Sequence, residues 1–184
     1  MGSHEQHPGI HTSLPMIDRP VVLVGMMGVG KTSIGKRLAA RLGIGFVDAD
    51  EEIERAAGMS IAEIFEKFGE PYFRDGERRV IARLIEGAPK IIATGGGAFI
   101  NDETRSLIHE RALSIWLDAD IKILAERVSR RNHRPLLTGR DPVKVLTELG
   151  NIRNPIYATA NIHVRSDTSP HSRTVDIILK ALGQ

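Results

Sequence analysis

A glycine-rich segment between a strand-like run and a helical pattern constrains the fold of this chain most. The segment "GMMGVGKT", Gly25 to Thr32, directly follows the apolar, β-branched run "PVVLV". Behind it, Ile34, Leu38 and Leu42 recur at helical spacing. The segment matches G-x-x-x-x-G-K-[ST] in full, in the strand–loop–helix context that this pattern requires. Its glycines let backbone N–H groups turn inward beside a helix N-terminus, so we expect the loop to hold phosphate groups.

The rest of the chain alternates short apolar runs with helical patterns. Strands are predicted at 44–50, 90–94, 113–117 and 161–165. The helices between them are predicted at 51–57, 60–68, 73–86, 102–111, around 121–128, from 141, at 151–159 and at 170–182. Ser60 with Glu63 forms a capping box, and Asp141 before Pro142 is typical of a helix start. We predict an α/β fold, a three-layer αβα sandwich with a short, mostly parallel central sheet.

Size and composition favour one domain inside the cell. The chain has 184 residues, no cysteine, and no run of 18 apolar residues. Its first 18 residues lack the basic and apolar parts of an export signal. We therefore expect a mobile extension over residues 1–18, a single domain over 19–184, a cytoplasmic location and no membrane partner. The low aromatic content, 4%, leaves no obvious large interface, so we expect a monomer.

Positive charge is concentrated in one segment although the net charge is only +2. Five arginines fall within fourteen residues that contain no acid: Arg127, Arg130, Arg131, Arg134 and Arg140. Such a segment can bind nucleic acid or small polyanions, and a basic surface loop is the simpler alternative. Aromatic residues for base stacking are absent from it, so we expect no nucleic-acid partner. The segment has the profile of a mobile lid over about 130–141, with Arg134 placed to stabilise the charge of a transferring phosphate.

The phosphate-binding loop is used both by enzymes that transfer a phosphate and by nucleotide-driven switches or motors. Neither D-x-x-G nor N-K-x-D, the usual marks of a GTP switch, occurs in the chain. A small ATP-dependent kinase of the P-loop type is therefore favoured. The residues expected to bind the nucleotide are Gly28, Val29, Gly30, Lys31, Thr32 and Ser33. Lys31 is expected to reach the β- and γ-phosphates, and the Thr32 hydroxyl to coordinate Mg²⁺.

Two carboxylates follow the second predicted strand, in "FVDAD". Asp48 and Asp50 would point to the same side if the strand continued that far. Beside a triphosphate, such acids need either a cation between them or a hydroxyl proton to accept. We assign Asp48 to the Mg²⁺ side and Asp50 to the hydroxyl of the phosphate acceptor. A solvated acidic turn or a helix N-cap is the alternative.

Two further segments point to the acceptor. "PYFRDGERR" presents Arg74, whose guanidinium could bind a substrate carboxylate in a bidentate manner, whereas Arg78 and Arg79 read as surface residues with i, i+4 partners. "KIIATGGGAFI" ends a predicted strand with Gly95, Gly96 and Gly97. Three consecutive glycines are costly in ordered structure, which suggests that something approaches this backbone closely.

Taken in order, six segments of this chain resemble those of the shikimate kinases, small P-loop kinases related to nucleoside monophosphate kinases. They are "GMMGVGKT", "FVDADEEIE", "SIAEIFEKFGEPYFRDGE", "TGGGA", "RPLL" and "RNPIYATA". The resemblance covers nearly all of the chain from about Val21. It implies transfer of the γ-phosphate of MgATP to the 3-hydroxyl of shikimate. A sugar-acid kinase, such as a gluconate kinase, and a nucleotide-binding regulatory domain without catalysis are the alternatives.

Carried over to the matching positions, the resemblance implies a role for each motif. Lys31, Asp50 and Arg134 are the expected catalytic residues, with Thr32 and Asp48 on the metal. The expected substrate-binding residues are Asp50, Arg74, Gly95, Gly96, Gly97 and Arg153. A β-carbon in the glycine segment would stand where the substrate ring must lie, and Glu77 would order the arginines. On the nucleotide side, Arg130 or Arg131 would stack on adenine, and Pro170 would face it.

Overall fold

The computed structural model describes residues 16–131, 137 and 139–183, and its centre is a parallel sheet. Five strands belong to that sheet among the described residues, in the order β2-β3-β1-β4-β5. All neighbouring pairs run parallel. The bounds are Val21–Val24 for β1, Gly45–Asp48 for β2, Lys90–Ala93 for β3, Leu113–Asp118 for β4 and Ile162–Arg165 for β5. Every residue of the central strand β1 is fully buried, which explains its continuous apolar sequence.

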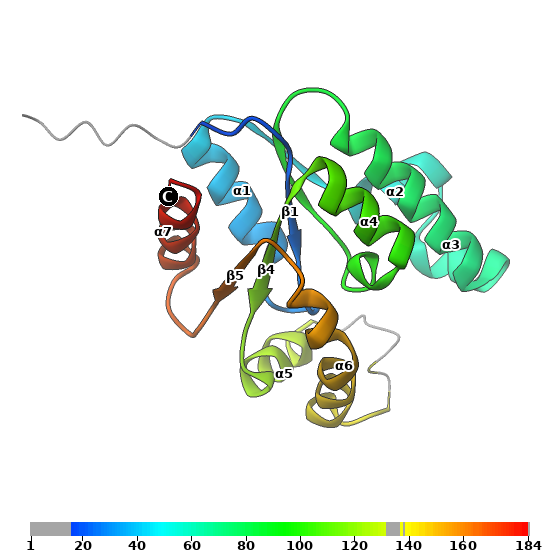
Figure 1. Cartoon of the computed structure of the whole chain (residues 1–184). Helices are drawn as coiled ribbons and strands as arrows, with labels where there is room; N and C mark the ends of the chain where they lie inside the picture. The colour runs from blue at the N-terminus through cyan, green and yellow to red at the C-terminus, as the bar shows by residue number, and fades with distance from the viewer. Residues whose placement is uncertain (1–15, 132–136, 138, 184) are drawn as a thin grey trace, which may run out of the picture.

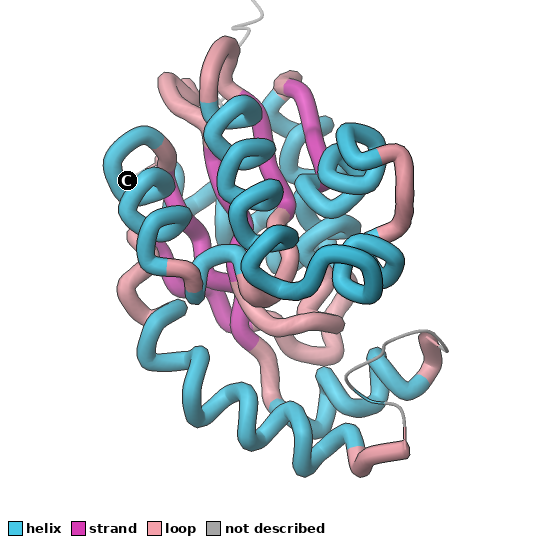
Figure 2. The backbone as a smooth tube through the Cα atoms, turned by 90° about the vertical axis from the view of Figure 1, so that its right-hand side faces the viewer, coloured by secondary structure: helices cyan, strands magenta, loops and turns pink. Residues whose placement is uncertain are grey.

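Helices cover the sheet, as the sequence predicts for a three-layer αβα sandwich. They are α1 (Lys31–Leu42), α2 (Ala49–Ala57), α3 (Ile61–Ile85), the short 3₁₀ helix η1 (Ala98–Ile100), α4 (Asp102–Arg111), α5 (Ile121–Ser129), α6 (Pro142–Tyr157) and α7 (His171–Leu182). Figure 1 shows α1 and α7 together on one side of the sheet, with α3 and α4 on the other. In Figure 2, turned by 90°, the strands run between these helices. The arrows of β1 and β4 point toward α5 and α6, so functional loops at the carboxyl ends of the strands lie there (Figure 1).

Local signals place several helix ends correctly. The Ser60 hydroxyl accepts from the Glu63 N–H, and the Glu63 carboxylate accepts from the Ser60 N–H, so the predicted capping box is confirmed. Asp141 caps α6 by accepting from the Val143 N–H. Gly43 ends α1 with φ 67°, a left-handed conformation that favours glycine.

Two predicted boundaries are wrong. The separate helix predicted at 151–159 is the second half of α6, which runs unbroken through Pro155. Strand β2 stops at Asp48, and α2 begins at Ala49, so Asp50 lies in the first turn of a helix and not on a strand. The two acids therefore come together through a strand-to-helix turn, and the alternation of a strand does not explain their shared direction.

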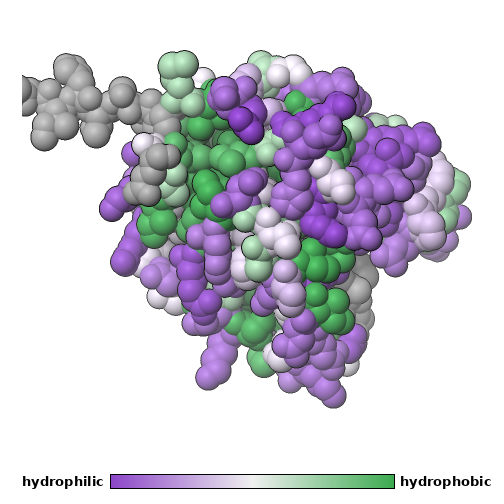
Figure 3. All heavy atoms as spheres, in the orientation of Figure 1, coloured by the Kyte–Doolittle hydropathy of each residue, from purple (hydrophilic) through white to green (hydrophobic). Residues whose placement is uncertain are grey.

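The helical segments predicted at 60–68 and 73–86 are the two parts of α3, joined by a kink at Gly69 with φ 82°. The apolar face predicted for the first part is only partly buried. Ile64 is in the core, whereas Phe65 and Phe68 are 38% and 49% exposed. Figure 3 shows hydrophobic residues in patches between hydrophilic ones on the face that it draws. Predicted helical periodicity thus located the helix but overstated how much of its face the core covers.

Parts of the predicted organisation lie outside the described residues. This applies to residues 1–15 of the predicted extension, and to 132–136 and 138 of the predicted lid, which include Arg134. Across the described part of the chain, no helix is both long and apolar enough to cross a membrane.

Candidate active site

A cleft of about 370 Å³ lies at the carboxyl ends of β1, β2 and β3. Three segments that are far apart in the sequence line it together: the phosphate-binding loop, the acids after β2 and the glycines after β3. The lining residues from these segments are Met27, Gly28, Gly30, Lys31, Thr32, Ser33, Asp48, Asp50, Thr94, Gly95 and Gly96. Arg127, Arg130, Arg131 and His171 complete the wall. One cleft therefore joins a cation-rich end to an end that holds Asp50 and the glycines.

The phosphate-binding loop has the backbone that its glycines predict. Gly25, Gly28 and Gly30 have φ values of 140°, 83° and 100°, which residues with a β-carbon rarely adopt. The Lys31 ammonium donates to the Gly25 carbonyl at 2.6 Å and to the Met26 carbonyl at 3.0 Å. These bonds hold the lysine against its own loop, inside the cleft. Val29 is fully buried and does not line the cleft, although the sequence placed it among the nucleotide-binding residues.

Asp48 was expected either to lie on the Mg²⁺ side of the site or to cap a helix, and its position allows both roles. One carboxylate oxygen accepts from the N–H groups of Asp50 and Glu51 at 3.0 and 3.4 Å, which makes Asp48 the N-cap of α2. The other oxygen accepts from the Thr32 hydroxyl at 2.8 Å. The cap fixes the carboxylate, and the fixed carboxylate lies beside the hydroxyl that opens α1. A hydroxyl and a carboxylate oxygen side by side are the kind of ligands that Mg²⁺ prefers.

The glycines after β3 leave room for neighbouring side chains, and their backbone conformation does not demand glycine. None of the three has a positive φ. A β-carbon on Gly95 would stand 2.9 Å from a carboxylate oxygen of Asp50, and one on Gly96 would stand 3.2 Å from the Arg153 guanidinium. On Gly97 it would overlap the guanidinium of Arg74. We expected a β-carbon to collide with the substrate, whereas the structure shows that it would first displace these charged side chains.

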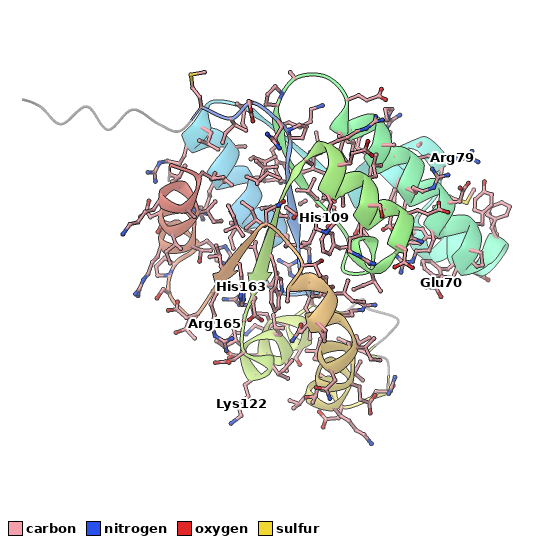
Figure 4. The ribbon with its side chains drawn as sticks, in the orientation of Figure 1. Glu70, Arg79, His109, Lys122, His163 and Arg165 are labelled. Atoms are coloured by element: carbon pink, nitrogen blue, oxygen red, sulfur yellow. The ribbon has the colours of Figure 1, made fainter. Side chains whose placement is uncertain are left out.

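Arg74 is held from two sides by acids of its own helix. Its Nη1 donates to Glu77 at 2.8 Å, and its Nε lies 3.4 Å from Glu70, which Figure 4 labels on α3. Glu77 is only 1% exposed, and this burial raises its pKa, an effect that the neighbouring Arg74 opposes. The charges of Asp50 and Arg153 also act on Glu77, so these four groups form one electrostatic cluster. Arg78 and Arg79, in contrast, pair with Asp75 on the surface, as predicted.

At the cation-rich end, Arg127 is a residue whose role the sequence did not reveal. It donates to the carbonyls of Gly28 and Val29 at 3.4 and 3.2 Å, and to the carbonyl of Asp167 at 3.0 Å. It thereby ties the phosphate-binding loop to the segment before α7. The five-arginine run signalled charge in this region, but only the fold shows that Arg127 bonds this loop.

His171 is the second such residue. Its ring lies beside Gly30, 3.2 Å from where a β-carbon would be, and burial lowers its pKa, aided by Arg127 and Arg37. The preceding Pro170, the expected adenine neighbour, caps α7 and does not line the cleft. The exposed His163 does not line the cleft. Figure 4 shows it beside Arg165 on β5, where its ring stacks on Trp116.

Tyr157, the last residue of α6, was also missed. It is fully buried, and its hydroxyl donates to the carbonyl of Gly96. Sequence gave no signal for this contact beyond its place in "RNPIY", because Gly96 and Tyr157 are 61 residues apart.

Comparisons with known proteins agree with this geometry. A family model for shikimate kinase matches residues 27–183. A shikimate kinase of Caulobacter vibrioides is 59% identical over 170 residues, which cover 92% of this chain and 85% of that protein. One from Novosphingobium aromaticivorans is 56% identical over 172 residues, covering 91% of this chain and 89% of the relative.

Solved structures show the same likeness. A shikimate kinase from Acinetobacter baumannii in complex with shikimate has a TM-score of 0.85 at 35% identity and covers 89% of this chain and 92% of its own. A gluconokinase from Sinorhizobium meliloti, at 20% identity and a TM-score of 0.60, covers 89% of this chain and 91% of its own and shares the fold alone. By its family match, its relatives and its structure, this chain belongs to the shikimate kinase family.

Proposed function

We infer that this protein is an ATP-dependent shikimate kinase, which transfers the γ-phosphate of ATP to the 3-hydroxyl of shikimate and releases ADP. One observation supports this most: the phosphate-binding loop and the glycines packed by Asp50, Arg153 and Arg74 lie at one set of strand ends. The first part suits a triphosphate, and the second suits a compact acceptor that carries both a carboxylate and hydroxyls. Family membership narrows that acceptor to shikimate.

On the nucleotide side, we assign binding to Gly28, Val29, Gly30, Lys31, Thr32 and Ser33. The amides of the loop and the N-terminus of α1 face the phosphates, and Lys31 leaves its carbonyl partners to reach the β- and γ-phosphates. Arg130 and Arg131 line the same cleft and suit the nucleotide, and Pro170 directly precedes His171, which also lines it. Charge neutralisation and positioning by these groups supply most of the rate.

The acceptor side aligns a hydroxyl with the γ-phosphate. Asp50 accepts a hydrogen bond from the attacking hydroxyl and takes its proton late in the transfer. Arg74 and Arg153 bind the substrate carboxylate, and Glu77 keeps Arg74 in place by an ion pair of 2.8 Å. Asp50 and Arg74 are themselves set by Gly95 and Gly97, which leave room for them.

Mg²⁺ is the proposed cofactor, and Thr32 and Asp48 are the residues that would hold it. In the described part of the chain, no group of three or more His, Cys, Asp or Glu side chains could hold a metal alone. This suits Mg²⁺, which keeps several waters and binds one or two protein oxygens together with phosphates. When bound, the ion would supply positive charge beside the β- and γ-phosphates.

The remaining assignments complete the proposal. From the sequence, we propose one kinase domain over residues 19–184, an extension over 1–18, and a lid over about 130–141 whose Arg134 acts on the transferring phosphate. Residues 1–15, 132–136 and 138 lie outside the described part of the chain. The protein acts as a monomer in the cytoplasm, without nucleic acid or membrane. Sedimentation velocity would test the monomer, since a dimer would contradict it.

An ADP-release assay tests the function directly. With MgATP, we expect turnover with shikimate and none with quinate, gluconate or a nucleoside monophosphate. Turnover with gluconate alone would keep the kinase and exclude shikimate as the acceptor. ATP binding without turnover on any acceptor would instead favour a regulatory domain. Omission of Mg²⁺, with EDTA present, should abolish the shikimate-dependent signal.

A further inference from the structure

Tyr157 joins the helix that carries Arg153 to the glycines of the acceptor site. It is the last residue of α6, is fully buried, and donates its hydroxyl proton to the carbonyl of Gly96. Arg153 lies one turn earlier on the same helix, and its guanidinium faces the α-carbon of Gly96. Gly96 is therefore contacted on its carbonyl by one side chain of α6 and on its open face by another.

With the bond to Tyr157, all three carbonyls of the glycine segment accept a hydrogen bond. The Gly95 carbonyl accepts from the Ala98 N–H at 3.3 Å, and the Gly97 carbonyl accepts from the Ile100 N–H at 3.2 Å. Both bonds are local to the turn that leads into η1. The carbonyl between them is bound by a residue 61 positions away. Consecutive glycines have the largest backbone freedom of any tripeptide, so a fixed outside partner has a large effect on their order.

The state of the tyrosine suits a permanent donor. Burial raises the pKa of Tyr157 to about 12, and the neighbouring Arg153 and Arg74 only partly oppose this. The phenol therefore keeps its proton at any pH at which the enzyme works. Trp116 lies beside the ring, with 6.0 Å between ring centroids, and fills space next to it.

We propose that Tyr157 is a positioning residue for phosphoryl transfer: its hydroxyl fixes the Gly96 carbonyl and thereby the relation of the glycine segment to Asp50, Arg74 and Arg153. The inference rests on the proposed function, because it assigns the acceptor to this segment. Each of the three charged side chains packs against one glycine. A segment that shifts by a few tenths of an ångström would therefore disturb the acceptor-binding groups together, while the phosphate-binding loop would keep its own bonds.

Tyr157→Phe removes the hydroxyl and keeps the ring, and the chain offers a matched control. Its only other tyrosine, Tyr72, is 57% exposed and stacks on Phe68, away from the cleft. We expect Tyr157→Phe to raise the KM for shikimate about tenfold, the size of effect expected when a buried carbonyl loses its donor. The KM for ATP should change by less than about twofold, because the loop bonds of Lys31 and Arg127 are untouched. Tyr72→Phe should leave both constants unchanged.

A readout that needs no turnover makes the test decisive. Hydrogen exchange in the peptide covering residues 94–100 should become faster in Tyr157→Phe and not in Tyr72→Phe.

A lower melting temperature with an unchanged KM for shikimate and unchanged exchange would reduce Tyr157 to a packing residue and overturn the proposal. If the wild type fails to phosphorylate shikimate, the proposed function fails. The exchange experiment then still decides whether Tyr157 fixes the segment.

Discussion

Two glycine-rich segments meet at the cleft, and they contain glycine for different physical reasons. In the phosphate-binding loop, Gly25, Gly28 and Gly30 have positive φ values, so the backbone itself demands glycine. In the segment after β3, none of Gly95, Gly96 and Gly97 does, and the missing β-carbons instead make room for Asp50, Arg153 and Arg74. Glycine in the phosphate-binding loop allows the backbone conformation that turns its amides inward. Glycine after β3 leaves room for charged side chains from other parts of the chain.

This difference predicts what happens when a side chain is added to each segment. A side chain added to the phosphate-binding loop strains a backbone or meets a neighbouring one: a β-carbon on Gly25 would overlap the Leu117 carbonyl. One added after β3 would push the flexible end of a charged side chain, which can move at little cost in stability. Damage to the first should therefore appear in folding, and damage to the second in acceptor binding.

The largest expected effect is that of Asp50→Ala, which removes the acid beside Gly95. We expect kcat to fall by at least about 100-fold, since a positioned general base contributes on the order of 10²–10⁴. ATP affinity, measured by fluorescence or calorimetry, should survive because the loop is intact. Loss of ATP affinity by tenfold or more would place Asp50 on the nucleotide side. Glu51→Ala, an exposed acid on the same helix, serves as the control.

Gly97→Ala tests the comparison most directly. Its methyl group would displace the Arg74 guanidinium, so kcat/KM for shikimate should fall roughly 30-fold, by about the loss of one charge-assisted contact. The unfolding midpoint should shift little. Gly25→Ala is the matched change on the other side and should lose about 3 kcal/mol or more of stability. Equal loss of stability in both variants would mean that the fold depends on glycine to the same extent in both segments, which contradicts the comparison.

Glu77→Gln tests how much the ion pair with Glu77 contributes to the position of Arg74 at the acceptor site. We expect the KM for shikimate to rise about fivefold, because Arg74 keeps a hydrogen bond but loses its buried ion pair.

The raised pKa of Glu77 also predicts how the stability of the protein depends on pH. Its folded-state pKa lies above its unfolded value of 4.5, so ionisation opposes folding as the pH rises through that range. Stability relative to Glu77→Gln should therefore fall between acid pH and neutrality, as measured by urea unfolding. A constant difference would exclude this titration.

The smallest expected effect concerns His171 at the cation-rich end. Because the folded-state pKa of His171 lies below 6.5, the unfolded chain binds the proton more readily, and stability is lost as the pH falls below about that value.

Bound phosphates would favour the charged form of the His171 ring. Lowering the pH from 7.5 to 6 should therefore raise ATP affinity in the wild type by roughly threefold more than in His171→Gln. His163→Gln, outside the cleft, should behave like the wild type. Parallel pH profiles for all three proteins would remove His171 from the nucleotide site.

Some of this site could be predicted because its signals are local in the chain. The pattern from Gly25 to Thr32 specifies its own turn, and the capping box at Ser60 specifies its own helix start. Arg74 was proposed from its own segment, whereas Arg153 was proposed only through the order of several motifs, since nothing near it in the sequence indicates what its guanidinium faces. The sequence placed Asp50 on a strand, which is wrong, because Asp48 caps α2 and the strand ends there. Asp50 nevertheless lines the cleft.

The sequence by itself determined the alternation of strands and helices, the phosphate-binding loop and the family, because these depend on residues that act on near neighbours. Only the tertiary structure decided why Gly95–Gly97 are bare, what Arg127 ties together, and which carbonyl Tyr157 binds. Each of these depends on groups that lie far apart in the chain and meet only when parallel strands bring their carboxyl ends together. A contact of that kind leaves no periodic or local trace in the sequence, so the packing of the sheet has to be known before the contact can be inferred.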